Sequence, residues 1–208
     1  MKEAPIFPVV LVAVAIAATV MLGDKTGINA ITQGEVVKEV PVVNVPAKLR
    51  QENWLGNGGP YDGSCCHAAL ISLLRWQGQF SLADRWFRNH SGGEVTWTMR
   101  EQLDSEGVRY AWCESGNEKF LEWAVATRRG ACIRYRARPD SQGFHMVNVV
   151  HLTDKLVGIL DNNDVRKFKW IDRDRFMQNW KTSEGGWAFT PVYSPAAPLP
   201  PRYRREML

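Results

Sequence analysis

The spacing of apolar residues changes from helical to strand-like near residue 107, and this change restricts the fold. Apolar residues recur at helical spacing over 66–77, where Leu70, Leu73 and Leu74 share one face and Gly78 ends the run. Further helices are predicted at 81–89, 97–106, 118–126 and 172–180, and strands at 108–112, 132–135, 146–152, 156–160 and 187–192. Because most helices precede the sheet instead of alternating with strands, the pattern predicts an α+β fold.

The strands at 146–152 and 156–160 are predicted to be antiparallel neighbours. Only Thr153, Asp154 and Lys155 join them. A parallel pair needs a crossover of a dozen or more residues, whereas an antiparallel pair needs only a tight turn. The sequence therefore predicts an antiparallel sheet that packs against the preceding helices.

Length and composition favour a single folded catalytic-sized domain. The chain has 208 residues, 45% of them apolar and nine of them tryptophan, and its net charge is +4. One core of ordinary size suits this length. The arginines are scattered instead of forming a basic patch, so nucleic acid is not expected as a partner. We predict that this domain spans 51–194.

The two ends of the chain differ in composition from the predicted domain. Residues 4–22 carry no charge and are near the length that a helix needs to cross a bilayer. We predict a signal anchor over 1–23, with a cleaved signal peptide as the alternative. Residues 24–50 are interpreted as a tether and 195–208 as a Pro-rich basic tail. The domain is thus expected to be exported, either anchored in the membrane by one span or secreted.

The four cysteines do not have the spacing of a metal site. They are Cys65, Cys66, Cys113 and Cys132, and they form no CxxC pair or Cys/His cluster. No metal and no cofactor are therefore expected. A disulfide between Cys113 and Cys132 stays open, although the apolar neighbours of Cys132 favour a buried free thiol.

Cys65 is the candidate nucleophile. The stretch 53–64, dense in Gly, Asn, Pro and Asp, predicts a loop that ends where the helix begins at Cys65. Free N–H groups at a helix N-terminus stabilise a thiolate, and Gly63 lets a substrate backbone approach closely. Cys66 is the alternative nucleophile, if the helix starts at a different residue.

His145 is the best placed of four histidines to act as the base. It opens a predicted strand directly after Phe144, where a side chain can face a helix terminus across a cleft. His67 lies within the nucleophile helix and is expected to point away from the thiol, while His90 lies in a polar loop. His151 lies near the far end of the same strand as His145.

Asp161 is the candidate residue that orients the histidine. In a hairpin that turns near Asp154, the start of one strand lies beside the end of the next, so His145 and Asp161 should be close. A carboxylate or amide on the second ring nitrogen fixes the imidazole tautomer. Asn162 and Asn163 are the alternatives for this role.

These residues resemble a known family. The run GSCCHAALISLLRWQG is similar to the nucleophile helix of C39-like, papain-fold cysteine peptidases, with Cys65 at the nucleophile. GFHMVNVV resembles the strand of the base at His145, and GILDNND resembles the segment of the orienting Asp161. RRGACIRYRA, FMQNW and GGWAFTPV extend the resemblance over roughly 50–194. The resemblance implies a papain-like fold with the nucleophile helix packed on an antiparallel sheet.

One position departs from the family pattern. Where the family has a glutamine that donates to the oxyanion, this chain has Gly59. An amide donor is the chemical requirement, so Asn57 and Asn53 are the candidate substitutes.

Three functions fit the order Cys, His, Asp. The preferred one is a cysteine hydrolase that cleaves peptide or related amide bonds through a thioester acyl-enzyme, acting on a peptide, a protein or peptidoglycan. The second is a transglutaminase-like acyl transferase, although Met146, Val147 and Asn162 do not match its usual pattern. The third is a membrane-tethered binding domain without turnover, which the missing glutamine and the adjacent cysteines would suit.

Overall fold

The order of the elements agrees with the predicted α+β fold. The computed structural model describes residues 40–54, 63–136, 144–183 and 185–194, which lie in one compact unit, Glu39–Leu208. The predicted signal anchor at 1–23 and the predicted tail at 195–208 lie outside the described residues. Within the described ranges, no helix is both long enough and apolar enough to cross a bilayer.

Helices come first and the sheet follows. The helices are α1 (Cys65–Trp76), α2 (Phe80–Asn89), α3 (Thr96–Ser105), α4 (Glu118–Ala126) and α5 (Arg173–Lys181), after a short 3-10 helix η1 (Ala47–Leu49). The strands are β1 (Tyr110–Cys113), β2 (Ala131–Tyr135), β3 (His145–Leu152), β4 (Leu156–Leu160), β5 (Phe168–Asp172) and β6 (Ala188–Pro191). Each predicted helix and strand is present, with ends shifted by at most a few residues.

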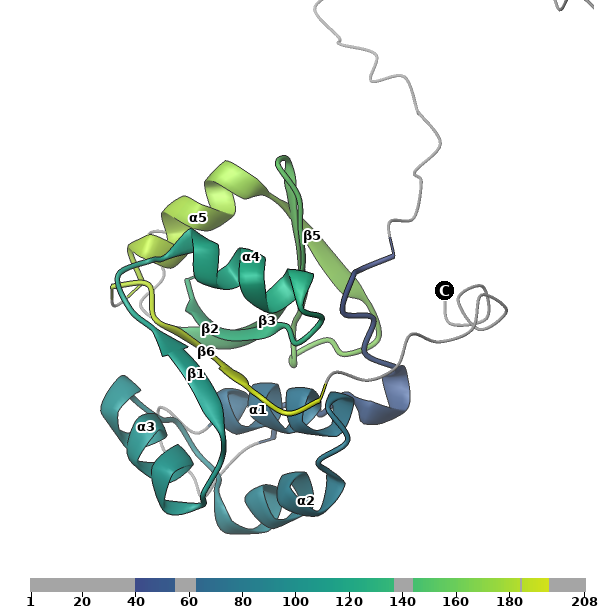
Figure 1. Ribbon diagram of the computed structural model, residues 1–208, viewed down its shortest axis with the longest axis vertical. Coiled ribbons are helices and arrows are strands. Elements are labelled where there is room, and N and C mark those ends of the chain that lie inside the picture. The colour runs from purple at the N-terminus through teal and green to yellow at the C-terminus, as the bar shows by residue number, and fades with distance from the viewer. Residues whose placement is uncertain (1–39, 55–62, 137–143, 184, 195–208) are drawn as a thin grey trace, which may run out of the picture. The chain divides into compact units, whose positions relative to one another are not determined.

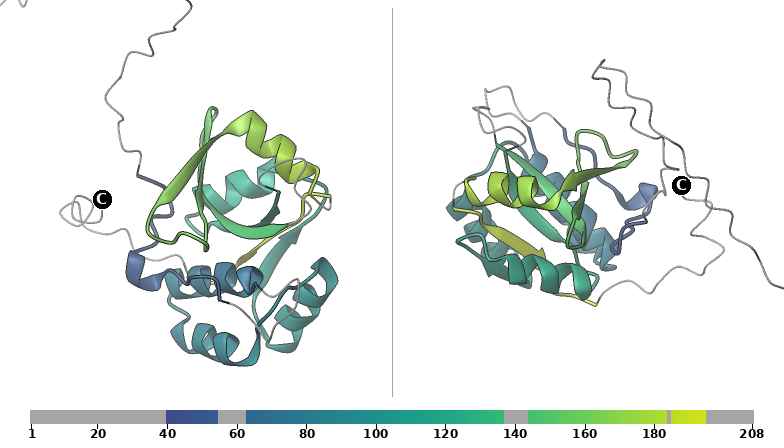
Figure 2. Two further views of the ribbon diagram at one scale, coloured as in Figure 1. Left: turned by 180° about the vertical axis from the view of Figure 1, so that it is seen from behind. Right: turned by 90° about the horizontal axis from the view of Figure 1, so that it is seen from above.

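The strands form a six-stranded sheet in the order β1-β6-β2-β3-β4-β5, and all neighbours are antiparallel. Helix α1 lies on one face of the sheet, and α4 and α5 lie on the other (Figures 1 and 2). Strand alternation divides the side chains of β3 between two cores. Met146 packs with α1, whereas Val147 and Val149 pack with α4 and α5.

Helix α1 is buried along most of its length. Leu70, Leu73 and Leu74 are fully buried, as the predicted helical spacing requires. Asn148 of β3 is buried as well, and its Nδ2 donates to the Ala69 carbonyl at 3.1 Å. A buried amide that finds a partner adds directional bonding to an otherwise apolar contact. The first residues of α1 are therefore fixed against β3.

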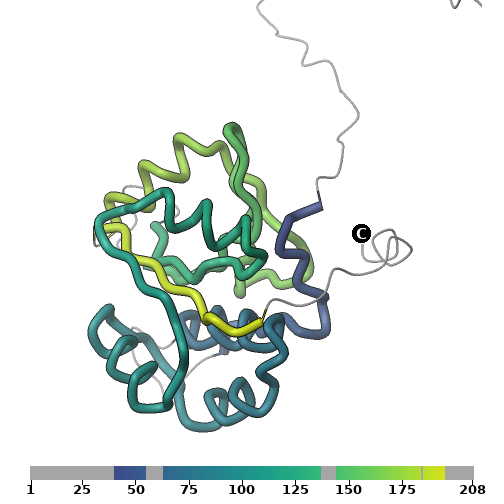
Figure 3. The backbone as a smooth tube through the Cα atoms, in the orientation of Figure 1, coloured from purple at the N-terminus to yellow at the C-terminus, as the bar shows by residue number. Residues whose placement is uncertain are grey.

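Residues 40–50, which the sequence interpretation placed in the tether, pack on the domain. Val43 and Val45 are fully buried, and the Val43 N–H donates to the Val150 carbonyl at 2.9 Å. Their side chains share a core with Trp76 and Leu160. Figure 3 shows this purple segment lying along the domain. In the described part of the chain, the packed domain thus begins near residue 40 and not at 51.

Strand β5 was not predicted from the sequence. Its residues FKWID mix charged and apolar side chains, and all of them are half-buried or exposed because β5 lies at the edge of the sheet. Charged residues are common on edge strands, where they hinder pairing with other chains. Because the segment is short and mixes charged with apolar residues, its sequence does not show the alternation that would have predicted a strand.

Gly158 allows β5 to pack closely on β4. It pairs with Trp170, and a Cβ at position 158 would lie 2.9 Å from both the Trp170 ring and the Cβ of His151. The tryptophan ring thus occupies the space that any other side chain would need.

Replacing Gly158 with alanine is expected to destabilise the domain by about 1–3 kcal/mol, because Trp170 must shift to admit the methyl group. Denaturant unfolding followed by far-UV circular dichroism measures this loss. In the double variant that also carries Trp170→Leu, the cost of the added methyl group should fall. An unchanged unfolding midpoint in Gly158→Ala would show that the contact is not tight.

Candidate active site

The loop before α1 holds Cys65 at the first position of the helix. The Ser64 N–H donates to the Trp54 carbonyl at 2.9 Å, and the Ser64 Oγ accepts the N–H of Gly92 at 2.8 Å. Ser64 is fully buried, whereas Cys65 is partly exposed. The N–H groups of the first helical turn have no carbonyl partner within the helix. They therefore give the N-terminal end of α1, where Cys65 lies, a partial positive charge.

The start of β3 lies directly against the thiol. The Met146 N–H points to the Cys65 Sγ at 3.4 Å. The neighbouring His145 ring is close enough to the same sulfur that its hydrogen bonding and charge help to lower the pKa of Cys65. His145 Nε2 lies 2.8 Å from Asp161 Oδ1, which leaves Nδ1 for the thiol. The structure therefore brings together all three residues selected from the sequence as the candidate triad.

Asp161 is held by three neighbours. Besides its contact with His145, its Oδ1 accepts a hydrogen bond from the N–H of Asn163 at 2.9 Å, and its Oδ2 accepts one from Lys169 Nζ. Lys169 belongs to β5, so sequence reasoning that missed this strand also missed the lysine. A charged partner on the far oxygen holds the carboxylate in one orientation relative to the imidazole.

The contacts around Cys65 lower its pKa to about 4. The largest cause is a side-chain hydrogen bond from Cys66; burial opposes the shift, and the bond and charge of His145 and the Met146 N–H favour it. Thiolate is the nucleophilic form of cysteine. At a pH above this pKa, Cys65 is therefore mostly the reactive thiolate.

The pKa of His145 is raised to about 9. Burial alone would lower it, but the hydrogen bonds to Asp161 and Cys65 and the negative charges of both more than offset that effect. The pKa of Asp161 is held below its usual range because the bonds from His145 and Lys169 outweigh burial. Between about pH 4 and pH 9 the site thus holds a thiolate beside an imidazolium.

Cys66, the alternative nucleophile, points into the protein. Cys66 is only 4% exposed, and its Sγ lies 3.9 Å from the Glu94 carbonyl oxygen. The hydrogen bond to Cys65 and burial raise the pKa of the Cys66 thiol well above its ordinary value. Cys66 is therefore a buried neutral thiol, while Cys65 is the cysteine that meets the histidine.

The asparagines proposed from the sequence occupy different positions. Asn162 Nδ2 donates to the carbonyls of Cys65 and Met146, at 3.0 and 2.9 Å, so it bridges α1 and β3 instead of contacting the imidazole. Asn53 Nδ2 donates to Asn163 Oδ1 at 2.9 Å. Asn57 lies outside the described residues.

Asn53 lies beside the entry to α1. Its Nδ2 would be 3.2 Å from a Cβ added at Gly63, so the amide packs on the backbone that leads into Cys65. The glycine at this position makes room for the amide. The amide of Asn53 thus lies next to the backbone that leads into the nucleophile.

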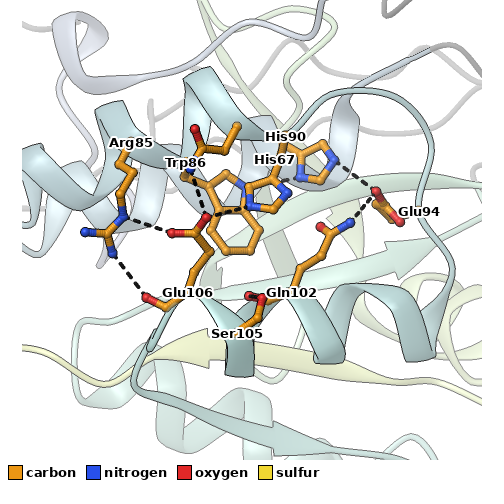
Figure 4. A network of polar contacts seen from close by, with 9 residues as sticks. His67, Arg85, Trp86, His90, Glu94, Gln102, Ser105 and Glu106 are labelled. Carbon is orange, nitrogen blue, oxygen red and sulfur yellow. Dashed lines mark hydrogen bonds and ion pairs between the residues drawn. The ribbon is translucent and has the colours of Figure 1, made fainter.

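A polar network lies behind the nucleophile helix (Figure 4). His67 is fully buried; its Nδ1 accepts the Trp86 indole N–H at 3.1 Å, and its Nε2 lies 3.5 Å from Glu94 Oε1. The same carboxylate oxygen accepts a hydrogen bond from Gln102 Nε2 at 2.7 Å. His67 therefore points away from the thiol, as the sequence predicts, and joins α1 to α2 and to the loop before α3.

A second carboxylate extends this network. Glu106 contacts His90 at 3.2 Å and Arg85 at 2.9 Å, and the His90 ring stacks on His67 at 5.7 Å between centroids. These contacts hold the three helices to one another on the side remote from the sheet. His67 and His90 are accordingly structural residues in this arrangement.

The remaining cysteines are buried free thiols, and no disulfide joins Cys113 to Cys132. Burial raises the pKa of Cys113 to about 11 and that of Cys132 well above its ordinary value. Within the described residues, no group of three or more His, Cys, Asp or Glu side chains is arranged to hold a metal ion.

Comparison with solved structures identifies the fold. The chain is similar to a C39-like peptidase from Bacillus anthracis, with 16% identity, a TM-score of 0.52, and coverage of 76% of this chain and 98% of that one. This chain has the papain-like fold of C39-like peptidases.

Three further comparisons gave one weaker structural similarity and no sequence match. The peptidase domain of Streptococcus ComA, a bifunctional ABC transporter involved in quorum sensing, is similar at 15% identity and a TM-score of 0.44, over 68% of this chain and 99% of that one. No protein-family model matches the sequence, and no curated protein matches it. The papain-like assignment therefore rests on the three-dimensional arrangement of the chain.

Replacing Cys66 with alanine should raise the pKa of Cys65, because it removes the largest cause of the low value. We expect the rate of iodoacetamide alkylation of Cys65 at pH 5 to fall as its pKa rises, by about twofold when the pKa reaches about 5 and by up to about tenfold for each further unit. The measurement is the pH dependence of alkylation, with the modified residue identified by mass spectrometry.

Cys66→Ser is the matched control, since its hydroxyl can still donate to the thiolate. It should retain most of the wild-type reactivity at low pH. Equal rates for wild type and Cys66→Ala across the pH range would contradict a role for the buried thiol.

Proposed function

We propose that this protein is a cysteine peptidase that hydrolyses peptide bonds through a thioester acyl-enzyme. The observation that carries the proposal is the contact of one imidazole with both Cys65 and Asp161, with the pKa of Cys65 lowered and that of His145 raised. A structural thiol has no need of an ion-pair partner. The papain-like fold supports the same conclusion.

The reaction follows from the charges. The Cys65 thiolate attacks the carbonyl carbon of the peptide bond, and the carbonyl oxygen becomes an oxyanion. His145 then gives its Nδ1 proton to the leaving amine as the tetrahedral intermediate collapses to a thioester. The neutral imidazole next removes a proton from water, which hydrolyses the thioester and restores the free thiolate and the imidazolium.

Asp161 and Lys169 act behind the imidazole. Asp161 holds Nε2 and so directs Nδ1 toward the sulfur. Lys169 neutralises part of the carboxylate charge and fixes its second oxygen. The orientation of His145 therefore depends on β5, through Lys169, as well as on β3 and β4.

Two donors are proposed for the oxyanion. One is the N–H of Cys65, which as the first residue of α1 lacks an intrahelical acceptor. The other is the amide of Asn53, which packs against Gly63. An asparagine on this loop would supply the function that a glutamine performs at the position of Gly59 in the resembled family.

Loss of Cys65, as Cys65→Ala, should abolish cleavage of a denatured protein or peptide mixture followed by mass spectrometry. His145→Ala should lower the rate by about 1000-fold or more, and Asn53→Ala by about 100-fold to 1000-fold if its amide serves the oxyanion. Cys113→Ser is the control, because this thiol is buried away from the site. Cleavage that persists in Cys65→Ala would overturn the proposal.

We also propose that the apolar segment 1–23 anchors the protein in a membrane and that the domain is exported. The support is the uncharged stretch of 4–22 in the sequence. The full-length chain should sediment with membranes and resist carbonate extraction. Val14→Arg places a charge at the centre of the span at a cost of about 2.5–3.5 kcal/mol, and should release the protein. A wild-type chain found in the soluble fraction and unprocessed would contradict the anchor.

A further inference from the structure

A cavity of about 330 Å³ opens beside the His145–Asp161 pair. Both residues line it, and strand β5 and the start of α5 complete its wall. A volume of this size is at the lower end of the range for small-ligand pockets and is large enough for an amino-acid side chain. None of the catalytic steps described above uses this space.

The floor of the cavity is apolar. Tyr135 lies opposite His145 in the β2–β3 register, and Val147 lies two residues beyond His145, so the three share one face of the sheet. Ile159 and Ile171 continue this surface. The floor can therefore cover the methylene groups of a side chain that enters beside the imidazole.

The rim carries a net positive charge. His145 as imidazolium, Lys169 and Arg175 face two carboxylates, Asp161 and Asp172. Three positive and two negative charges leave one positive charge in excess.

Both carboxylates already have partners. Asp161 accepts bonds from His145 and Lys169, and Asp172 accepts the backbone N–H of Arg175 as the N-cap of α5. Among the described residues, Arg175 is thus the one cation of the rim that forms no ion pair with a carboxylate.

Arg175 and Tyr135 are donors that lack an acceptor among the residues that the structure describes. In the described part of the chain, the exposed Arg175 guanidinium forms no ion pair or side-chain hydrogen bond. The Tyr135 hydroxyl likewise has no partner among those residues, although Tyr135 is only 5% exposed. An arginine fork with a nearby hydroxyl matches the geometry of a carboxylate.

The direction of the reaction decides which part of a substrate meets this cavity. The leaving amine must lie near His145 to receive its proton, so the chain that follows the scissile bond passes over the imidazole. The first residue of that leaving segment is then adjacent to the cavity that His145 lines.

We infer that this cavity, termed here the leaving-side pocket, selects substrates with a carboxylate on the residue that follows the scissile bond. The inference rests on the proposed peptidase function and adds a substrate class to it. Arg175 binds the carboxylate at the rim while the apolar floor covers the connecting methylenes. The carboxylate comes from an aspartate or glutamate side chain, or from a free C-terminus when one residue is released.

The first test profiles cleavage of a defined peptide mixture by the full-length protein. Bonds followed by Asp or Glu, or by a single C-terminal residue, should be cleaved at least about fivefold faster than matched bonds followed by Gln or a C-terminal amide. Arg175→Gln should remove this preference, whereas Arg175→Lys should retain part of it. Arg88→Gln, which removes an exposed cation from α2, is the control for net charge.

The two sources of the carboxylate give different products. A preference for internal Asp and Glu identifies the side chain as the ligand, and release of single C-terminal residues identifies the terminal carboxylate. Cleavage of neutral and acidic peptides at equal rates would overturn the leaving-side pocket while the peptidase function stood.

The second test does not need turnover. Bromoacetylglycine and bromoacetylglycinamide both alkylate Cys65 and differ only in their terminal carboxylate and amide. The ratio of their rates, acid over amide, should fall about threefold to fivefold in Arg175→Gln and stay constant in Arg88→Gln at low salt.

A ratio that ignores Arg175 would overturn the pocket even if no cleaved peptide were found. A thiol that reacts only near its ordinary pKa with both reagents would instead overturn the proposed function, and the inference with it. The two failures are therefore distinguishable.

Discussion

The contact between the first turn of α1 and the first residues of β3 is the constraint on which the site depends. Asn162 holds the carbonyls of Cys65 and Met146 with one amide, and the Met146 N–H points at the Cys65 sulfur. A sheet residue and a helix residue far apart in sequence are thereby fixed at hydrogen-bond distance. His145 needs no loop of its own to reach the thiol, since the strand carries it there.

Much of this arrangement follows from the sequence because the relevant residues lie at the ends of strongly patterned elements. Cys65 comes directly after a Gly-rich and Asn-rich loop and before a helical apolar repeat. His145 and Asp161 come at the open end of a hairpin whose turn is too short for any other topology. Hairpin geometry then brings His145 and Asp161 to the same end of the strand pair, and His145 Nε2 lies 2.8 Å from Asp161 Oδ1.

Other parts could not be predicted because their pattern is weak. Strand β5 mixes charged with aromatic residues, so it was not predicted. Lys169 and much of the leaving-side pocket belong to this strand and were therefore not predicted either. Asn162 was considered only as a partner for the histidine, since nothing in its local sequence indicates that it bridges two elements. The hydrogen bond from Cys66 to Cys65 likewise depends on side-chain directions at a helix start, which spacing alone does not fix.

The buried valines before η1 bear on where this protein can be cut. Val43 and Val45 share a core with Trp76 and Leu160, and the Val43 N–H donates to the Val150 carbonyl. A recombinant fragment that starts at residue 51, the boundary that composition suggests, would leave this apolar surface open to water. Such a fragment would expose a hydrophobic patch at the end of α1 remote from Cys65. A low yield or aggregation of this fragment would therefore say nothing about the catalytic residues.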